Sequence, residues 1–531
     1  MQRRSIFFAL STAATIALSA CSDQTGGSAS SVASNLRAGD NDVPEMGLEQ
    51  LGREGLEGRE GVAGEGARPD FEARRSCTPG DDLENAPPVV DVDGLRAVPI
   101  DIRRLDATVV LDAKTRTAAV EVTLQFRMGA TSGYPIFDLR QDIGEAFLNG
   151  TRLDPAKLGQ HDFGGGAGAS LRVIEKRLPA CSRNELTLVY ALNKPSAANS
   201  KAIGWAADSS RVTWDFWLSD LYAGRYLEQW FPANLIYDKF AFDLDLKLEN
   251  SELPHSVVTN GEALKVGDAH WLIAYPKRFT AISPMLVLTP NDAVSTYDTT
   301  LELASGRSLE LALVKENGIT ADLPALAAQI KGWVDEFTAS TGEYAHGDRL
   351  TVYVWNNSSR SMEYDGATTS NLRSLEHELF HSWYARGVKP AGQNDGWIDE
   401  AWTVYNTDGV VAFEVKALDP QAPPVLLASA NPWNRITAGA SYGAGQKLFA
   451  GLAAEMGLDP LRRAMKRFYG RHALDVITTQ ELERFLYCTS RNEAVPAAFH
   501  RFVYGRSDAA PAPDPRVCRR GRGADELAAT P

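Results

Sequence analysis

The segment HELFHSWYARGVKPAGQNDGWIDEAW, residues 377–402, carries the residues of a metal site at helical spacing. On an α-helix, residues i and i+4 lie on one face, so His377 and His381 can bind one metal ion together. Glu378 lies about 100° around the helix, where it can accept a proton from water without being a ligand. Glu400 follows His381 after eighteen residues and supplies a third ligand. Three protein ligands with an open fourth position predict a catalytic rather than a structural site, with one Zn²⁺ per chain.

The alternative is a helix that carries two histidines by chance. Only eight histidines occur in 531 residues, and two of them stand at the metal spacing with a glutamate between them. The neighbouring apolar residues give this helix a side to bury: Leu375, Leu379, Phe380 and Trp383. We therefore favour the zinc site.

The amino terminus predicts export. Residues 1–4 form a basic segment with two arginines, residues 6–18 are mostly apolar, and Leu18-Ser19-Ala20-Cys21 is similar to a bacterial lipobox. The apolar run is too short for a membrane span. We expect a signal peptide over residues 1–20 and a lipid on Cys21. The protein would then be a lipoprotein anchored on the periplasmic side of the cell envelope, and Ser22 favours the outer membrane.

Residues 21–90 predict a disordered tether, because they are rich in Gly, Ser and Glu and almost free of aromatic residues. Residues 506–531 predict a C-terminal tail that ends in a small basic cluster. The formal net charge of −14 gives no indication of a nucleic-acid partner.

The remaining chain predicts two domains. Residues 91–295 contain short alternating runs such as ATVVLDAKTRTAAVEVTLQFRM (residues 107–128), which indicate an all-β saddle or sandwich. Helical patterns dominate from about residue 320, beginning with DLPALAAQIKGWVDEFTAS (residues 322–340) and interrupted by a strand at residues 349–355. We expect a mainly α catalytic domain over residues 296–505. The aromatic-rich residues 212–231 either line a cleft between the domains or, as we favour for most of these rings, pack in the core.

Four cysteines remain after Cys21, an even number that suits an oxidising compartment. Of the three possible connectivities we favour Cys77–Cys181 with Cys488–Cys518, because each pair closes within one region. None of these cysteines has the spacing of a metal site.

The metal segment resembles the gluzincin aminopeptidases of peptidase family M1, which include aminopeptidase N and leukotriene A4 hydrolase. Their pattern is HExxH, eighteen residues and then Glu. Residues 441–445 (SYGAG) look like the family's Tyr-x-Lys-Gly segment, with alanine in place of lysine, and the resemblance gives Tyr442 the role of stabilising the tetrahedral intermediate. Residues 361–364 (SMEY) look like a reduced Gly-x-Met-Glu-Asn strand, which implies that Glu363 binds the free amine of the substrate.

The resemblance implies a thermolysin-like catalytic domain and an aminopeptidase that acts on peptide substrates, with Glu378 as general base. An endopeptidase or a glycyl-aminopeptidase-like enzyme is the alternative within enzymes. A binding lipoprotein built on a peptidase scaffold is the alternative from another class, although binding alone would not need Glu378.

Overall fold

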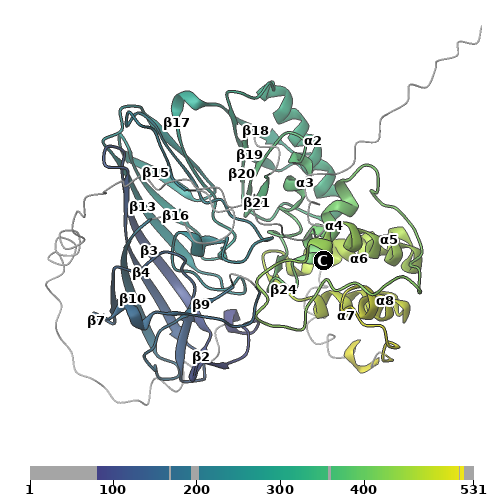
Figure 1. Ribbon diagram of the computed structural model, residues 1–531. Coiled ribbons are helices and arrows are strands. Elements are labelled where there is room, and N and C mark those ends of the chain that lie inside the picture. Colours follow the sequence, from purple (N-terminus) through teal and green to yellow (C-terminus); the bar gives the residue numbers. More distant parts are fainter. Residues whose placement is uncertain (1–80, 167–168, 193–201, 357–359, 513–514, 519–531) are drawn as a thin grey trace, which may run out of the picture.

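The computed structural model describes residues 81–166, 169–192, 202–356, 360–512 and 515–518. The predicted signal peptide and most of the predicted tether lie outside these residues. Figure 1 shows the strands of the first half of the chain on one side of the molecule and the helices of the second half on the other. The predicted order, a β-rich N-terminal region followed by a mainly helical one, is confirmed.

The largest sheet has eight strands in the order β15-β16-β13-β3-β4-β10-β6-β7. Along β3 and β4, side chains alternate between buried and accessible positions, because successive residues of a strand point to opposite faces. The buried face packs into the core of the β-rich region. The strands are β3 (Ile100–Asp112), β4 (Thr117–Met128), β6 (Glu145–Leu148), β7 (Thr151–Leu153), β10 (Arg183–Ala191), β13 (Ala241–Glu249), β15 (Glu262–Gly267) and β16 (His270–Tyr275).

Two smaller sheets complete this region. One has the order β1-β2-β5-β9-β8 and the other the order β11-β12-β17-β14. The first contains β1 (Val90–Val92), β2 (Leu95–Val98), β5 (Tyr134–Phe137), β8 (Gln160–His161) and β9 (Leu171–Val173). The second contains β11 (Gly204–Trp205), β12 (Val212–Asp215), β14 (His255–Thr259) and β17 (Leu286–Pro290). Short 3₁₀ helices occur at η2 (Asp81–Leu83), η3 (Pro155–Lys157), η4 (Leu227–Gln229) and η5 (Asn291–Ala293).

The second region begins with a five-stranded sheet in the order β18-β19-β20-β22-β21, which places β21 at an edge. Its strands are β18 (Val294–Glu302), β19 (Ser308–Glu316), β20 (Arg349–Val354), β21 (Met362–Tyr364) and β22 (Ala367–Ser370). The helices are α2 (Leu323–Thr341), α3 (Leu375–Phe380), α4 (Trp397–Thr407), α5 (Gly443–Met456), α6 (Leu458–His472), α7 (Thr479–Ser490) and α8 (Ala494–Phe502). Two short strands, β23 (Lys389–Pro390) and β24 (Val476–Ile477), pair in parallel, and η6 (Gly439–Ser441) and η7 (Pro515–Cys518) are 3₁₀ helices.

Helix α3 is held in the core by its apolar side, as its sequence predicts. Leu375, Leu379, Phe380 and Trp383 are all buried. The ring of Phe337 on α2 lies 4.9 Å from Phe380, between ring centroids, and the indole N–H of Trp383 donates to the carbonyl of Gly342 at 2.8 Å. Buried aromatic contacts of this kind fix the helix that carries the first predicted metal ligand.

Among the described residues, none of the helices combines the length and the hydropathy that a membrane span requires.

Candidate metal centre and active site

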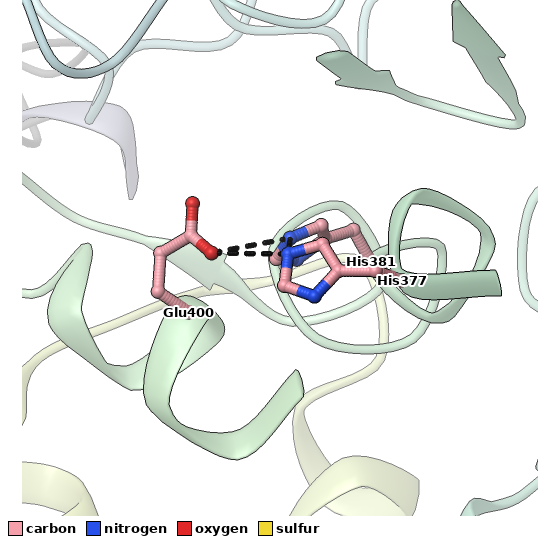
Figure 2. A group of neighbouring side chains, drawn as sticks. All are labelled: His377, His381 and Glu400. Carbon is pink, nitrogen blue, oxygen red and sulfur yellow. Dashed lines mark hydrogen bonds and ion pairs between the residues drawn. The ribbon is translucent and has the colours of Figure 1, made fainter. Parts of the chain in front are cut away.

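The structure brings the three predicted metal ligands together. His377 lies on α3, Glu400 lies in the first turn of α4, and His381 immediately follows the last residue of α3 while keeping helical backbone angles. Oε2 of Glu400 is 3.3 Å from Nε2 of His377 and 3.5 Å from Nε2 of His381, and the two Nε2 atoms are 3.1 Å apart. Figure 2 shows the Glu400 carboxylate pointing at both imidazole rings.

These distances fit a zinc ion. Zn–N and Zn–O bonds of about 2.0–2.1 Å at tetrahedral angles separate neighbouring ligand atoms by about 3.3–3.4 Å. The three observed separations lie around this value, and two imidazoles with one carboxylate form a donor set that zinc accepts. The side chain of His377 is 23% exposed, whereas that of His381 is 1% exposed, so the centre is accessible from the side of His377.

The ring of His381 is oriented by hydrogen bonds on its far side. Its Nδ1 lies 3.0 Å from the carbonyl oxygen of Tyr384 and 3.2 Å from Oγ1 of Thr403, one turn after Glu400 on α4. A carbonyl can only accept, so Nδ1 carries the proton and the lone pair of Nε2 faces the centre. Burial alone would lower the pKa of His381, but the carboxylates of Glu363 and Glu400 raise it well above its usual value. The centre therefore attracts positive charge.

Glu378 lies beside the ligands and is buried. One of its carboxylate oxygens lies within 4.8 Å of ligand atoms of both Glu363 and His381. Its Oε2 has no hydrogen-bond partner among the described residues. Burial, followed by the charge of Glu363, raises the pKa of Glu378 well above its usual value. A carboxylate in this position is suited to accept a proton.

Tyr442 reaches the centre through Glu400. Its hydroxyl donates to Oε1 of Glu400 at 2.6 Å, and its ring stacks on that of His377 with a centroid distance of 6.4 Å. The position of Gly445 explains the second residue of the predicted Tyr-x-x-Gly pattern. A Cβ at Gly445 would lie 2.5 Å from the Cβ of Ala401, so only glycine allows α5 this close approach to α4.

Glu363 lies on the edge strand β21, and its neighbour in the structure was not predicted. Nη2 of Arg386 donates to Oε1 of Glu363 at 2.7 Å, and both side chains are almost fully buried. Ala385, which precedes Arg386, is buried and has a φ of 132°, a region that costs an alanine conformational energy. This strained turn lies shortly after α3, the helix that carries His377, and it places the Arg386 side chain within hydrogen-bond distance of Glu363.

A further acid, Asp220, lies near enough to the site to feel the charges of Glu400 and Glu363, and it was also missed. Burial, and then the charges of Glu400 and Glu363, raise the pKa of Asp220 to about 7. It lies within the aromatic-rich residues 212–231, of which Trp214 and Trp230 are buried in the core of the β-rich region. The favoured core role therefore holds for these two rings, while the acid between them interacts electrostatically with Glu400 and Glu363 of the site. Its polarity within an aromatic run was the only signal in the sequence.

Cys488 and Cys518 form a disulfide bond in the structure, which is one of the two predicted pairs. Cys181 is also disulfide-bonded. Cys77, its predicted partner, and Cys21, the predicted lipidation site, lie outside the described residues.

The same architecture occurs in solved zinc peptidases. An M1 zinc metallopeptidase from Deinococcus radiodurans superposes with a TM-score of 0.56 at 15% identity, over 82% of this chain and 100% of its own. This chain has the fold of the M1 zinc metallopeptidases. Yeast LTA4 hydrolase with bestatin matches with a TM-score of 0.56 at 14% identity, over 78% of this chain and 69% of its own. For aminopeptidase A from Legionella pneumophila the TM-score is 0.59 at 12% identity, over 78% of this chain and 51% of its own. No family model and no curated protein matches the sequence.

Proposed function

We propose that this protein is a zinc-dependent aminopeptidase, which removes N-terminal residues from peptides. The observation that carries the proposal is the convergence of His377, His381 and Glu400 at tetrahedral spacing, with the non-ligand Glu378 beside them. The fold shared with M1 zinc metallopeptidases supports it. A binding protein would need neither a carboxylate oxygen without a hydrogen-bond partner at Glu378 nor the position of this side chain next to the ligands.

When bound to the two histidines and Glu400, a zinc ion would polarise the scissile carbonyl and lower the pKa of the attacking water to about 7. Glu378 accepts the proton of the attacking water and passes it to the leaving nitrogen. Tyr442 has one hydroxyl proton, which it donates to Glu400 in the free protein. To stabilise the developing oxyanion, it must turn that proton towards the substrate.

The acids near the centre favour a substrate with a free amino terminus. The charges of Glu363 and Asp220 both raise the pKa of the buried Glu378. Glu363 also forms an ion pair with Arg386. A protonated amine placed between acids gains charge-assisted hydrogen bonds, whereas a blocked amide does not. A preference for a free over a blocked amine would distinguish the proposed aminopeptidase from the endopeptidase that the sequence left open.

The metal is tested first. We expect purified protein to contain about one zinc per chain by elemental mass spectrometry, because the ligand set holds one ion. Hydrolysis of aminoacyl anilides should disappear on treatment with a chelator and return when zinc is added. A variant of the Deinococcus enzyme was solved with the substrate Tyr-Ser-Ala, which makes this tripeptide a second probe. A folded protein that hydrolyses these substrates without any metal would refute the proposal.

Glu363→Gln tests whether the enzyme recognises the free amino terminus of its substrate. Glutamine keeps the size of the side chain and an oxygen for Arg386 but loses the charge. We expect kcat/KM for free-amine substrates to fall about 10- to 100-fold, since a hydrogen bond to a charged group is worth about 1.5–3 kcal/mol. Hydrolysis of the matching N-acetylated peptides should change little.

Asp298→Asn, at an exposed acid on β18 of the same sheet, is the matched control, because it also replaces a carboxylate by an amide of the same size. A wild-type enzyme that prefers N-acetylated peptides and cuts them internally would establish the endopeptidase instead.

A further inference from the structure

Residues 429–441, which we name the bridging segment, contact both regions of the molecule and directly precede Tyr442. Alternate residues of this segment contact the β-rich region. The amide of Asn431 donates to the carbonyl of Gly164 at 2.7 Å. The ring of Trp433 lies 4.7 Å from that of Phe163. The backbone N–H groups of Arg435 and Thr437 donate to the carbonyls of Gly165 and Asp220 at 3.2 and 3.1 Å.

Arg435 provides the strongest of these contacts. Its Nη1 lies 2.9 Å from Oδ2 of Asp138, and its Nη2 lies 3.0 Å from Oε1 of Glu228. All three side chains are at most 2% exposed, and Arg140 also donates to Asp138, at 3.0 Å. The planar guanidinium can join two carboxylates at fixed angles, which the single ammonium group of a lysine cannot do. Arg435 therefore fixes its own backbone against two separate segments of the β-rich region.

The other side of the bridging segment packs on the residues just before α4. The amide of Asn394 donates to the carbonyl of Asn431 at 2.7 Å, and the amide of Asn434 donates to Oδ1 of Asn394 at 2.9 Å. A Cβ at Gly396 would lie 2.4 Å from Oγ1 of Thr437. The segment thus lies in close contact with the start of the helix that carries Glu400.

We propose that Arg435 is a positioning residue for the active site, which sets the place of Tyr442 and, through its hydroxyl, of the Glu400 carboxylate. Through Asp138 and Glu228, the β-rich region would then fix the positions of Tyr442 and Glu400 in the active site. Arg435 acts through Tyr442 and touches no reacting atom. The effect on turnover rests on the proposed peptidase function, whereas the effect on the position of Tyr442 does not.

The test is a double-mutant cycle between Arg435→Lys and Tyr442→Phe, measured on the zinc-loaded protein. Arg435→Lys keeps the charge but cannot span both acids. At saturating zinc we expect kcat to fall about tenfold or more, because a misplacement of about 1 Å costs up to about 10²-fold, with KM little changed. In the Tyr442→Phe background the same substitution should lower kcat less than about twofold, since the group it positions is already gone. An equal fall in both backgrounds would show a merely structural role and overturn the proposal.

Hydrogen–deuterium exchange gives a readout that needs no hydrolysis. In Arg435→Lys, the amides of residues 439–446 should exchange faster than in the wild type, while those of α2 should not change. Unchanged exchange over residues 439–446 would overturn the proposal even in a protein without peptidase activity. Faster exchange with no hydrolysis in the wild type would instead contradict only the proposed function.

Arg103→Lys is the control, because Arg103 also pairs with a buried acid of the β-rich region, Asp101, at 2.8 Å, and has no ion pair with the bridging segment. It should leave kcat and the exchange of residues 439–446 unchanged. If Arg435→Lys does not fold, Asn431→Ala, which removes the contact with Gly164, takes its place in the same cycle with the same expected pattern.

Discussion

Glu378→Gln is expected to lower kcat about 10²- to 10⁴-fold while the protein keeps its zinc, because general-base catalysis typically contributes that much. Glutamine has nearly the same size as glutamate, but its amide cannot accept the proton of the attacking water. Glu378 is not one of the three converging ligands, so its replacement leaves the metal donors in place. The measurement is kcat on aminoacyl anilides at saturating substrate, with zinc content determined on the same samples.

Glu376→Gln is the matched control, since Glu376 lies on the same helix and also has a raised pKa, caused by burial and by Glu336. It should leave kcat unchanged. If Glu378→Gln turned over substrate at close to the wild-type rate with zinc bound, Glu378 would have no role in proton transfer.

The three metal ligands could be predicted because their approach follows mostly from local geometry. His377 and His381 are one helical turn apart, and Glu400 opens the next long helix. Even here the structure differs in detail, since α3 ends at Phe380 and His381 stands one residue beyond it. The chain turns shortly after His381, at the strained Ala385. This turn depends on tertiary packing, which the sequence pattern does not predict.

Arg386, Asp220 and Arg435 could not be predicted for the same reason. Asp220 is more than 150 residues from Glu378 in the sequence, and the pairing of Arg435 with Asp138 spans 297 residues. No periodicity reports contacts of this range, because they arise only when the two regions pack on each other. Glu363, which the resemblance assigns to binding of the substrate amine, has a cationic partner, Arg386, on a turn formed by a different segment, and this pairing could not be predicted either.

The β-rich region shows the opposite case. Alternation along residues 107–128 predicted the strands, and the structure places them in β3 and β4, joined by a short turn between Asp112 and Thr117. The order of the strands was not predictable, because β13 pairs with β3 in parallel across more than a hundred residues. Local burial patterns determine which face is apolar, whereas strand order depends on long-range pairing.

Tyr442→Phe is expected to have two separable effects. The first is a fall in kcat of about 10²- to 10³-fold at saturating zinc, because one hydrogen-bond donor to a developing oxyanion is typically worth that much. The second is weaker zinc binding by about 10- to 100-fold, because the hydroxyl holds Oε1 of Glu400 at 2.6 Å while Oε2 faces the two histidines. Competition with a chromophoric chelator measures the second effect without any substrate.

The two effects distinguish the roles that the structure allows for this hydroxyl. If only zinc affinity falls, Tyr442 orients Glu400 and does not reach the substrate. If only kcat falls, the hydrogen bond to Glu400 contributes nothing to metal binding and the proton serves the oxyanion alone. Tyr405→Phe is the control, because Tyr405 lies on α4 and its hydroxyl donates to the carbonyl of Glu414 at 2.7 Å, away from the ligands. Loss of the Tyr405 hydroxyl should lower the stability of the protein but leave kcat and zinc affinity unchanged. If kcat or zinc affinity fell as much in Tyr405→Phe as in Tyr442→Phe, any buried hydroxyl near α4 would have the same effect, and Tyr442 would have no special role.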